Sequence, residues 1–274
     1  MSIKAILSKR PLPLRITAAV IAFAMIGCLL WLAKNLLGNP ISYYLVKTNA
    51  EKYVAENYAD KGYVLEGVGY SFKFDRYYAY IAKPGSEDCR FTAYYNANGK
   101  FGQDDYESRV LNGGNTGSRL HMRYRELADS VLESPSFPYK SDIAFTELIF
   151  ERDSDGEHDF GLPQSVLAPD AIYDIAQLGE MAGLLVIYVD TENVSPENAA
   201  DILLEINSLM EQGGVPFYAI DLTLSTTEPD YADREHYVIM NFHRSDIYED
   251  GLITRVENNH QQTEARWAEL DKER

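Results

Sequence analysis

Cysteine is scarce in this chain and histidine is scattered, and both facts argue against common kinds of site. Cys28 lies in an apolar run and Cys89 in the polar part of the chain, so no disulfide framework holds the fold together. None of the five histidines forms a His-Glu-x-x-His motif or the close pair that zinc sites use. His236 and His243 are seven residues apart in a predicted strand, which places them on opposite faces. The sequence therefore predicts no zinc site.

Positive charge is scarce beyond the N-terminus. All 42 acidic residues follow residue 34, together with 20 of the 25 basic residues, so this part of the chain has a net charge of −22. A surface of that sign repels phosphate backbones and anionic lipid headgroups. The sequence therefore predicts no nucleic-acid partner, and the acidic excess is expected to serve solubility.

A long apolar run without charge extends from Ile16 to Ala33. As a helix it covers roughly 27 Å, close to the thickness of the hydrocarbon core of a bilayer. Trp31 suits the membrane–water interface at the end of such a helix. The residues before the run include four basic residues and no acidic residue: Lys4, Lys9, Arg10 and Arg15. The positive-inside tendency therefore predicts a single-pass protein of the cell membrane, with a cytoplasmic N-terminus and extracytoplasmic C-terminal domains.

Two other fates of this segment stay open. A cleaved signal peptide is disfavoured, because the apolar run is long for one and no Ala-x-Ala-like site ends it. Residues 25–28 weakly resemble a lipoprotein box in which Cys28 would carry the lipid. The apolar residues 29–33 that follow would make a poor tether for such a protein. An uncleaved transmembrane helix is the favoured interpretation.

The pattern after this segment predicts an α+β fold in two extracytoplasmic domains. Residues 1–38 are expected to hold the basic leader and the transmembrane helix, residues 39–139 the first domain, and residues 140–274 the second. Breaks rich in glycine and proline mark both boundaries, at Gly38-Asn39-Pro40 and near Ser136-Phe137-Pro138.

The first domain is predicted to have an α-β-β-β-α order. A helix is expected over residues 41–59, where apolar residues recur at helical spacing after Asn39-Pro40. Three alternating segments joined by short turns predict an antiparallel meander, at residues 68–74, 78–82 and 91–95. A second helix over residues 120–131 follows a glycine-rich entry and completes the domain.

The second domain is predicted to be a small mixed α/β domain. Its strands are expected at residues 143–150, 184–189, 215–224 and 236–243. Ser195-Pro196 opens a helix between the second and third of these strands, which predicts a βαβ crossover with parallel strands. A C-terminal helix is expected to pack through an apolar face that includes a buried Trp267, together with Ile253, Val256 and Leu270.

Five segments spread over the part of the chain after the anchor carry a family resemblance. They are NPISYYLVKTNAEKY (39–53), VLNGGNT with RL (110–120), FPYKSDI (137–143), VPFYAIDL (215–222) and SDIYEDGL with RVENNH (245–260). On these segments the chain resembles the YfjL-like family, membrane-anchored proteins of Gram-positive bacteria. The resemblance implies the anchor and two outer domains, and it supplies no activity and no catalytic residues.

An acidic loop offers a weak candidate for calcium binding. Its candidate ligands are Glu151, Asp153, Asp155 and Asp159. Oxygen side chains alternate there and Gly156 takes the sixth position, as at the start of a calcium loop. The twelfth position, where a bidentate glutamate belongs, is Leu162. A solvated acidic loop is the favoured interpretation, and no cofactor other than this possible calcium ion is implied.

Tyrosine is the unusual component of the sequence, because 14 of the 20 tyrosines lie between Tyr43 and Tyr139. Five of them lie at both odd and even positions of the predicted strands: Tyr77, Tyr78, Tyr80, Tyr94 and Tyr95. Because alternate residues face opposite sides of a sheet, some of these side chains must face solvent or a partner. Tyrosine favours strands, and it is also common where proteins bind one another. Ordinary sheet packing is favoured, and a tyrosine-lined binding face is the alternative.

These observations favour a binding protein over an enzyme. The first hypothesis is a membrane-anchored protein that binds a protein or peptide partner at the cell envelope. The second is an envelope hydrolase that uses separated carboxylates such as Asp153, Asp155 and Asp221, with or without a bound metal ion.

Overall fold

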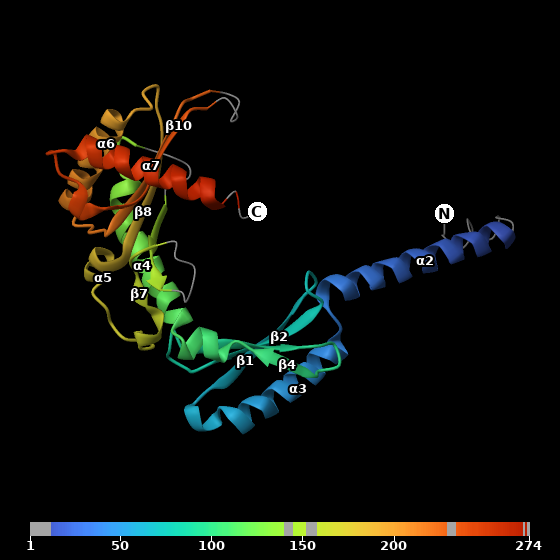
Figure 1. The fold of residues 1–274 in the computed structure, drawn as a ribbon. Helices are drawn as coiled ribbons and strands as arrows, with labels where there is room; N and C mark the ends of the chain where they lie inside the picture. Colours follow the sequence, from blue (N-terminus) through green and yellow to red (C-terminus); the bar gives the residue numbers. More distant parts are fainter. Residues whose placement is uncertain (1–11, 140–144, 152–157, 229–233, 271, 273–274) are drawn as a thin grey trace. The chain divides into compact units, whose positions relative to one another are not determined.

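A computed structural model describes residues 12–139, 145–151, 158–228, 234–270 and 272 (Figure 1). The chain forms two compact units, residues 1–109 and residues 110–274. Each unit contains its own sheet and its own helices. The mixed α+β character that the sequence predicts is confirmed.

The first unit begins with two helices that meet at a glycine. Helix α2 spans Leu12–Leu37 and helix α3 spans Pro40–Asn57. Between them Gly38 adopts a left-handed conformation with φ of 78°. The Asn39 side chain accepts a hydrogen bond of 3.0 Å from the Ile41 N–H, so the predicted helix start at Asn39-Pro40 is confirmed.

Helix α2 supplies the apolar segment that a membrane span requires. Among the described residues, the helical run Ile16–Asn57 is the one whose length and composition would allow it to cross a membrane. Its apolar window has a mean hydropathy of 2.4, and none of that window is buried within the protein. A signal sequence near an N-terminus has the same properties.

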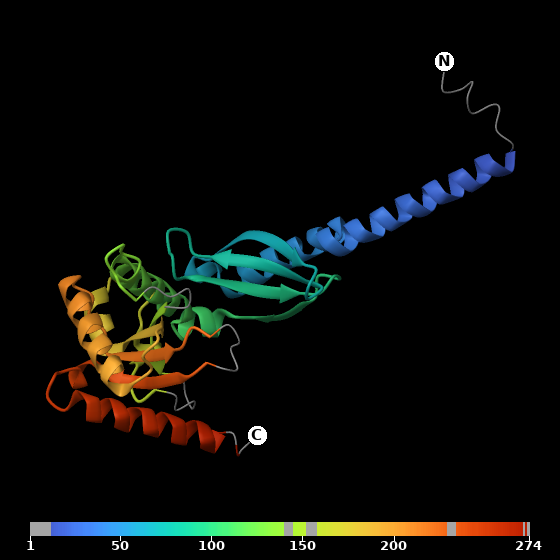
Figure 2. The same ribbon diagram turned by 90° about the horizontal axis from the view of Figure 1, so that it is seen from above.

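The sheet of the first unit is an antiparallel meander of four strands, β1 to β4. They are β1 (Val64–Ser71), β2 (Arg76–Ala82), β3 (Arg90–Tyr95) and β4 (Phe101–Asp104), and each pairs with the next. The predicted meander is confirmed, and β4 is an addition to it. Helix α3 covers one face of the sheet, through Val46, Ala50 and Val54 (Figures 1 and 2). The 3-10 turn η1 (Ala59–Lys61) joins α3 to β1, and the π-helical turn η2 (Glu107–Leu111) follows β4.

Helix α4 (Gly114–Leu132) belongs to the second unit, which corrects the predicted domain boundary at residue 139. It packs against strand β5 and helix α5. Its Tyr124 is fully buried and donates a hydrogen bond of 3.0 Å to the Pro216 carbonyl oxygen. The ring fits because Gly179 has no side chain; a Cβ atom there would lie 2.4 Å from Tyr124 Cε2. These contacts hold α4 in the second unit.

The second unit is built on a four-stranded mixed sheet in the order β10-β9-β8-β5. Its strands are β5 (Phe145–Leu148), β8 (Gly183–Asp190), β9 (Ala219–Ser225) and β10 (His236–His243). Strands β8 and β9 are parallel and are joined by α6 (Pro196–Gln212), so the predicted βαβ crossover is confirmed. The Ser195 hydroxyl accepts a hydrogen bond of 3.2 Å from the Asn198 N–H and caps α6, as the sequence predicts.

Shorter elements lie between these strands and after β10. They are β6 (Phe150–Glu151), β7 (Leu162–Pro163), α5 (Ile175–Ala182) and the 3-10 turns η3 (Gln164–Val166) and η5 (Arg244–Asp246). Strands β6 and β7 pair in parallel and form a sheet of their own. The main core lies between the four-stranded sheet and α6, where Leu203, Ile206 and Ile220 are completely buried.

A bulge in β10 overturns the expectation that His236 and His243 face opposite ways. His236 pairs with Ser225 and His243 with Ala219, six residues apart on β9. The register shifts between Ile239 and Phe242, where Asn241 has φ of 52°. Because the extra residue restores an even spacing, the two histidines lie on the same face of the sheet.

Helix α7 (Leu252–Leu270) lies against the outer strand β10 (Figure 1). Its Asn259 side chain holds the bulge, since it accepts a bond of 3.1 Å from the Met240 N–H and donates one of 2.9 Å to the Met240 carbonyl oxygen. Leu252 and Val256 are buried. Trp267 is 40% exposed, so the prediction of a buried Trp267 ring is wrong. Burial along the helix ends at Thr263, before the ring is reached.

Two matched substitutions in α7 should separate its packed start from its exposed end. Leu252→Ala should lower the free energy of unfolding by about 2–5 kcal/mol, because Leu252 is 2% exposed in the core. Leu270→Ala should change it by less than about 1 kcal/mol, because Leu270 is 49% exposed. Urea unfolding followed by circular dichroism measures both. Equal losses would show that the end of α7 packs against something else in solution.

Candidate functional site

The five candidate tyrosines divide between the two faces of the first sheet. Tyr77 and Tyr95 point toward α3 and are each 2% exposed. Tyr78, Tyr80 and Tyr94 lie on the opposite face, because successive residues of a strand alternate. Tyr80 is 48% exposed there, and the other two are half-buried. The candidate binding surface is therefore reduced to these three side chains, called the open face below.

The rings on the open face are held in place by neighbours. Tyr78 and Tyr94 are directly opposite on β2 and β3, and their ring centroids are 5.4 Å apart in an edge-to-face arrangement. The Tyr94 hydroxyl donates a hydrogen bond of 3.1 Å to Asp105, which also accepts one of 2.6 Å from the Thr92 N–H. Burial and the adjacent Asp105 charge both raise the pKa of Tyr94. These contacts leave Tyr94 little rotational freedom to lose on binding a partner.

Strand β1 adds a strip without side chains beside these rings. Gly67 and Gly69 stand opposite Tyr80 and Tyr78 on β2. The Tyr80 ring lies over Gly69, where a Cβ atom would be 2.9 Å from the Tyr80 hydroxyl oxygen. Strand β1 is also an outer strand of its sheet. The open face thus joins an exposed aromatic ring to accessible backbone, which suits contact with a peptide or a protein surface.

Tyr77 and Tyr95 have structural roles on the covered face. The Tyr77 hydroxyl accepts a hydrogen bond of 2.7 Å from the Asn39 N–H, and its ring contacts Tyr43 and Tyr70 at 5.3 and 4.8 Å between centroids. Among the described residues the Tyr95 hydroxyl has no hydrogen-bond partner. Burial, followed by the Asp104 charge, raises the pKa of Tyr95 to about 12.

Asp104 on β4 accepts hydrogen bonds from two tyrosines, a role that no motif in the sequence predicts. It accepts hydrogen bonds from the hydroxyls of Tyr53, in a short contact, and of Tyr58, at 3.0 Å. Burial and the bond to Asp104 raise the pKa of Tyr53. The Tyr58 ring continues into a cluster with Phe91 and Tyr106. The tyrosines in and just after α3 were the one signal for these hydrogen bonds in the sequence. Their acceptor, Asp104, lies in β4, a strand that the sequence did not predict.

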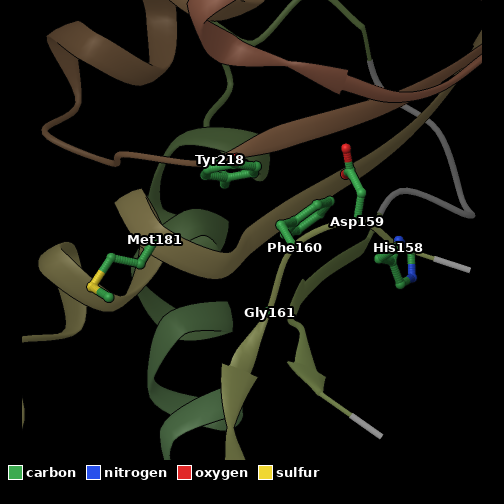
Figure 3. Close-up of a pocket in the computed structure, with 6 residues that line it drawn as sticks. All are labelled: His158, Asp159, Phe160, Gly161, Met181 and Tyr218. Carbon is green, nitrogen blue, oxygen red and sulfur yellow. The ribbon is translucent and has the colours of Figure 1, made fainter. Parts of the chain in front are cut away.

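The second unit has a pocket of about 420 Å³ beside the sheet (Figure 3). It is lined by His158, Asp159, Phe160, Gly161, Met181 and Tyr218. The rings of Phe160 and Tyr218 lie 4.6 Å apart between centroids. Asp159 Oδ1 is 3.2 Å from His243 Nε2, and His158 Nδ1 is 2.6 Å from Asn241 Oδ1. These polar pairs join residues more than eighty positions apart, so no motif in the sequence marks them.

The structure describes only part of the predicted acidic site. Asp153 and Asp155 lie outside the described residues, and Glu151 is placed only as a backbone position in β6. Asp159 is the one ligand candidate with a described side chain, and it faces His243. Within the described ranges no group of three or more histidine, cysteine or carboxylate side chains could hold a metal ion. Calcium binding therefore stays a prediction.

The hydrolase hypothesis is also untested by this geometry. Of its three carboxylates only Asp221 is described, in the middle of β9. Asp221 Oδ1 accepts a hydrogen bond of 2.6 Å from the Asn241 N–H and so supports the β10 bulge.

Comparison with known families accounts for most of the chain. A model described as YfjL-like, N-terminal domain, matches residues 14–108, and one described as YfjL-like C-terminal domain matches residues 123–257. The gap between the two matches contains the boundary between the two units. No curated protein and no solved structure matches the chain.

The two covered tyrosines make a matched pair for substitution. Tyr77→Phe should lower the free energy of unfolding by about 0.5–1.5 kcal/mol, because the Asn39 N–H loses its acceptor. Tyr95→Phe should change it by less than about 0.5 kcal/mol or raise it, because the lost hydroxyl has no partner among the described residues. Thermal unfolding at neutral pH measures both, and a larger loss for Tyr95→Phe would contradict the assignment.

The same pair has a pH signature. Burial, followed by the Asp104 charge, raises the pKa of Tyr95 from 10.0 to about 12 in the folded protein, so its hydroxyl ionises less readily there than in the unfolded chain. Between pH 10 and 12 the unfolded state therefore loses this proton first, and the stability of the fold falls as the pH rises. The Tyr95→Phe protein should therefore lose less stability than the unaltered protein between pH 10 and 12.

Proposed function

We propose that this chain, which belongs to the YfjL-like family, is a membrane-anchored extracytoplasmic protein whose open face binds a protein or peptide partner. The anchor is helix α2, and the partner surface is the set of Tyr78, Tyr80 and Tyr94. The observation that carries the binding role is Tyr80, a large aromatic side chain that is 48% exposed on an otherwise ordered sheet face.

The exposure of α2 supports the anchor. Its large apolar residues are uncovered in the protein, with Phe23 75% exposed and Leu30 66% exposed. Leaving such a helix in water costs about 25 cal/mol for each Å² of apolar surface, which a bilayer removes. The helix has 26 residues and therefore extends for about 39 Å, enough to cross the hydrocarbon core.

Charge supports the orientation. Four basic residues precede the apolar run: Lys4, Lys9, Arg10 and Arg15. After the run, only Lys34 lies close to it. Basic residues favour the cytoplasmic side of a membrane helix, so both units are expected outside the cytoplasm.

The open face supports partner binding by its chemistry. Tyrosine combines a large apolar ring with a hydroxyl, and it loses little conformational freedom when it is bound. The Tyr78–Tyr94 contact and the Asp105 hydrogen bond hold these rings before any partner arrives. Preorganisation of this kind lowers the entropic cost of association.

A photocrosslinking experiment tests the open face. With a benzoylphenylalanine in place of Tyr80, irradiation of native membranes should give an adduct of one defined mass. The same group in place of Tyr248 should give none, although Tyr248 is similarly exposed at 50% in the second unit. Tyr78→Ser in the same chain should lower the yield of the Tyr80 adduct. The absence of a defined adduct at residue 80 would show that the open face binds no protein or peptide partner.

A protease experiment tests the topology. Protease added to intact cells stripped of their wall should digest both units and leave a small membrane-retained fragment that ends near Asn39. Changing Lys4, Lys9, Arg10 and Arg15 to glutamine should give a mixed population, because the charge bias is removed. Complete protection of the unaltered protein would reverse the orientation. Release of an intact soluble domain before protease is added would show a cleaved signal.

A further inference from the structure

We infer that the turn between β1 and β2, residues 72–75, lies on the headgroup surface of an anionic bilayer beside α2. This inference rests on the proposed anchoring by α2. It gives the first unit a second membrane contact, made by a loop rather than by a transmembrane segment. This turn lies at one end of the first unit, together with the β3–β4 turn (residues 96–100) and residues 38–44. These three segments form the hairpin end of the unit.

The β1–β2 turn exposes two large aromatic side chains, two residues apart. Phe72 is 66% exposed and Phe74 is 61% exposed. Between them, Lys73 places its Nζ 5.5 Å from the centroid of the Phe74 ring. Aromatic rings beside a long basic side chain are typical of segments at a membrane–water interface, where the rings enter the lipid and the amine reaches the headgroups.

Contacts within the first unit place this turn close to the end of α2. Gly38 packs against the Tyr70 ring, and a Cβ atom at Gly38 would lie 2.9 Å from Tyr70 Cγ and from the Tyr77 hydroxyl. Tyr70 and Tyr77 form the second cross-strand pair from the turn, after Ser71 and Arg76, and α2 itself contacts β1. Figures 1 and 2 both show the turn beside the C-terminal end of α2.

The distances match the thickness of a headgroup layer. Gly38 follows the end of the apolar run by five residues, which is roughly 7 Å along a helix. Phe72 follows Tyr70 by two residues, or roughly 7 Å along a strand. The interfacial region of each leaflet is about 5–8 Å thick. The turn is therefore within reach of the lipid surface whenever α2 spans the bilayer.

The start of α3 extends the same apolar surface. Ile41 is 69% exposed and Tyr44 is 70% exposed, while the side of α3 that faces the sheet is buried at Val46 and Ala50. Leu37, at the end of α2, is also 69% exposed. These side chains and the two phenylalanines belong to the same end of the unit.

Local charge at the hairpin end is opposite to that of the chain as a whole. The exposed residues Lys73, Arg76 and Lys100 lie in or beside the two turns, and Asp75 is the one acidic residue in these turns. Asp75 accepts a hydrogen bond of 2.9 Å from the Tyr70 hydroxyl. The chain has a formal net charge of −17, so three basic residues against one acid are a marked local reversal. Anionic headgroups attract such a patch.

Site-directed fluorescence quenching tests this contact in the full chain. Cys28 and Cys89 are changed to serine, and a bimane label is attached to a single cysteine at Phe72→Cys. The control carries the label at Lys83→Cys, an exposed residue in the β2–β3 turn at the other end of the sheet. Both proteins are reconstituted in phosphatidylcholine vesicles that contain phosphatidylglycerol, and are quenched with brominated lipid or with aqueous iodide.

The label at residue 72 should be quenched by brominated lipid and protected from iodide, and the label at residue 83 should show the reverse. Lys73→Gln with Arg76→Gln should reduce the ratio of lipid-contacting to water-exposed label about 25-fold, because each basic residue near an anionic surface contributes about fivefold. Lys83→Gln should leave that ratio unchanged.

Other outcomes overturn the inference in distinguishable ways. Equal iodide quenching at residues 72 and 83, in protein that remains in the vesicles, removes the lipid contact and leaves the anchor intact. Protection from both quenchers at residue 72 assigns the hairpin end to a protein partner or a second copy instead. Protein that does not remain with the vesicles contradicts the proposed anchor as well.

Discussion

The first unit depends on the close approach of Gly38 to the rings of Tyr70 and Tyr77. Only a residue without a side chain fits there, and its φ of 78° is one that glycine adopts at little cost. The Asn39 N–H then reaches the Tyr77 hydroxyl, so the backbone between α2 and α3 is tied to the sheet. Through these contacts the direction of α2 is coupled to the sheet, and the open face and hairpin end are positioned with it.

The tyrosines of the first unit show how one residue type serves different purposes within a single sheet. On the covered face their rings fill the space beneath α3, and Tyr53 and Tyr58 direct their hydroxyls to Asp104. On the open face the Tyr80 ring lies over the backbone of Gly69. Composition alone therefore overstates the candidate binding surface, because most of the tyrosine excess is used in packing.

Local signals in the sequence predicted the elements well where one residue type determines the geometry. Asn39-Pro40 and Ser195-Pro196 marked two helix starts, and alternation marked β2 and β3. Strand β4 escaped because Phe101–Asp104 contains a single apolar residue and owes its place to pairing with β3. Nonlocal contacts decided the rest. The Tyr124–Pro216 hydrogen bond places α4 in the second unit. The bulge in β10, held by Asn259, brings His236 and His243 to the same face of the sheet. Trp267 had the right spacing for a core residue, but the burial of α7 ends before it.

The two units also differ in how soon they can fold as the chain is made. In the first unit every strand pairs with its neighbour in sequence, so contacts close soon after each hairpin is synthesised. In the second unit Tyr124 must wait for Pro216, 92 residues later, and the outer edge of β10 stays uncovered until α7 follows. Synthesis therefore completes a small folded sheet behind α2 while the rest of the chain is still unpaired. Until α7 follows β10, the second unit presents an open strand edge, which is a template for unwanted pairing with a strand of another chain.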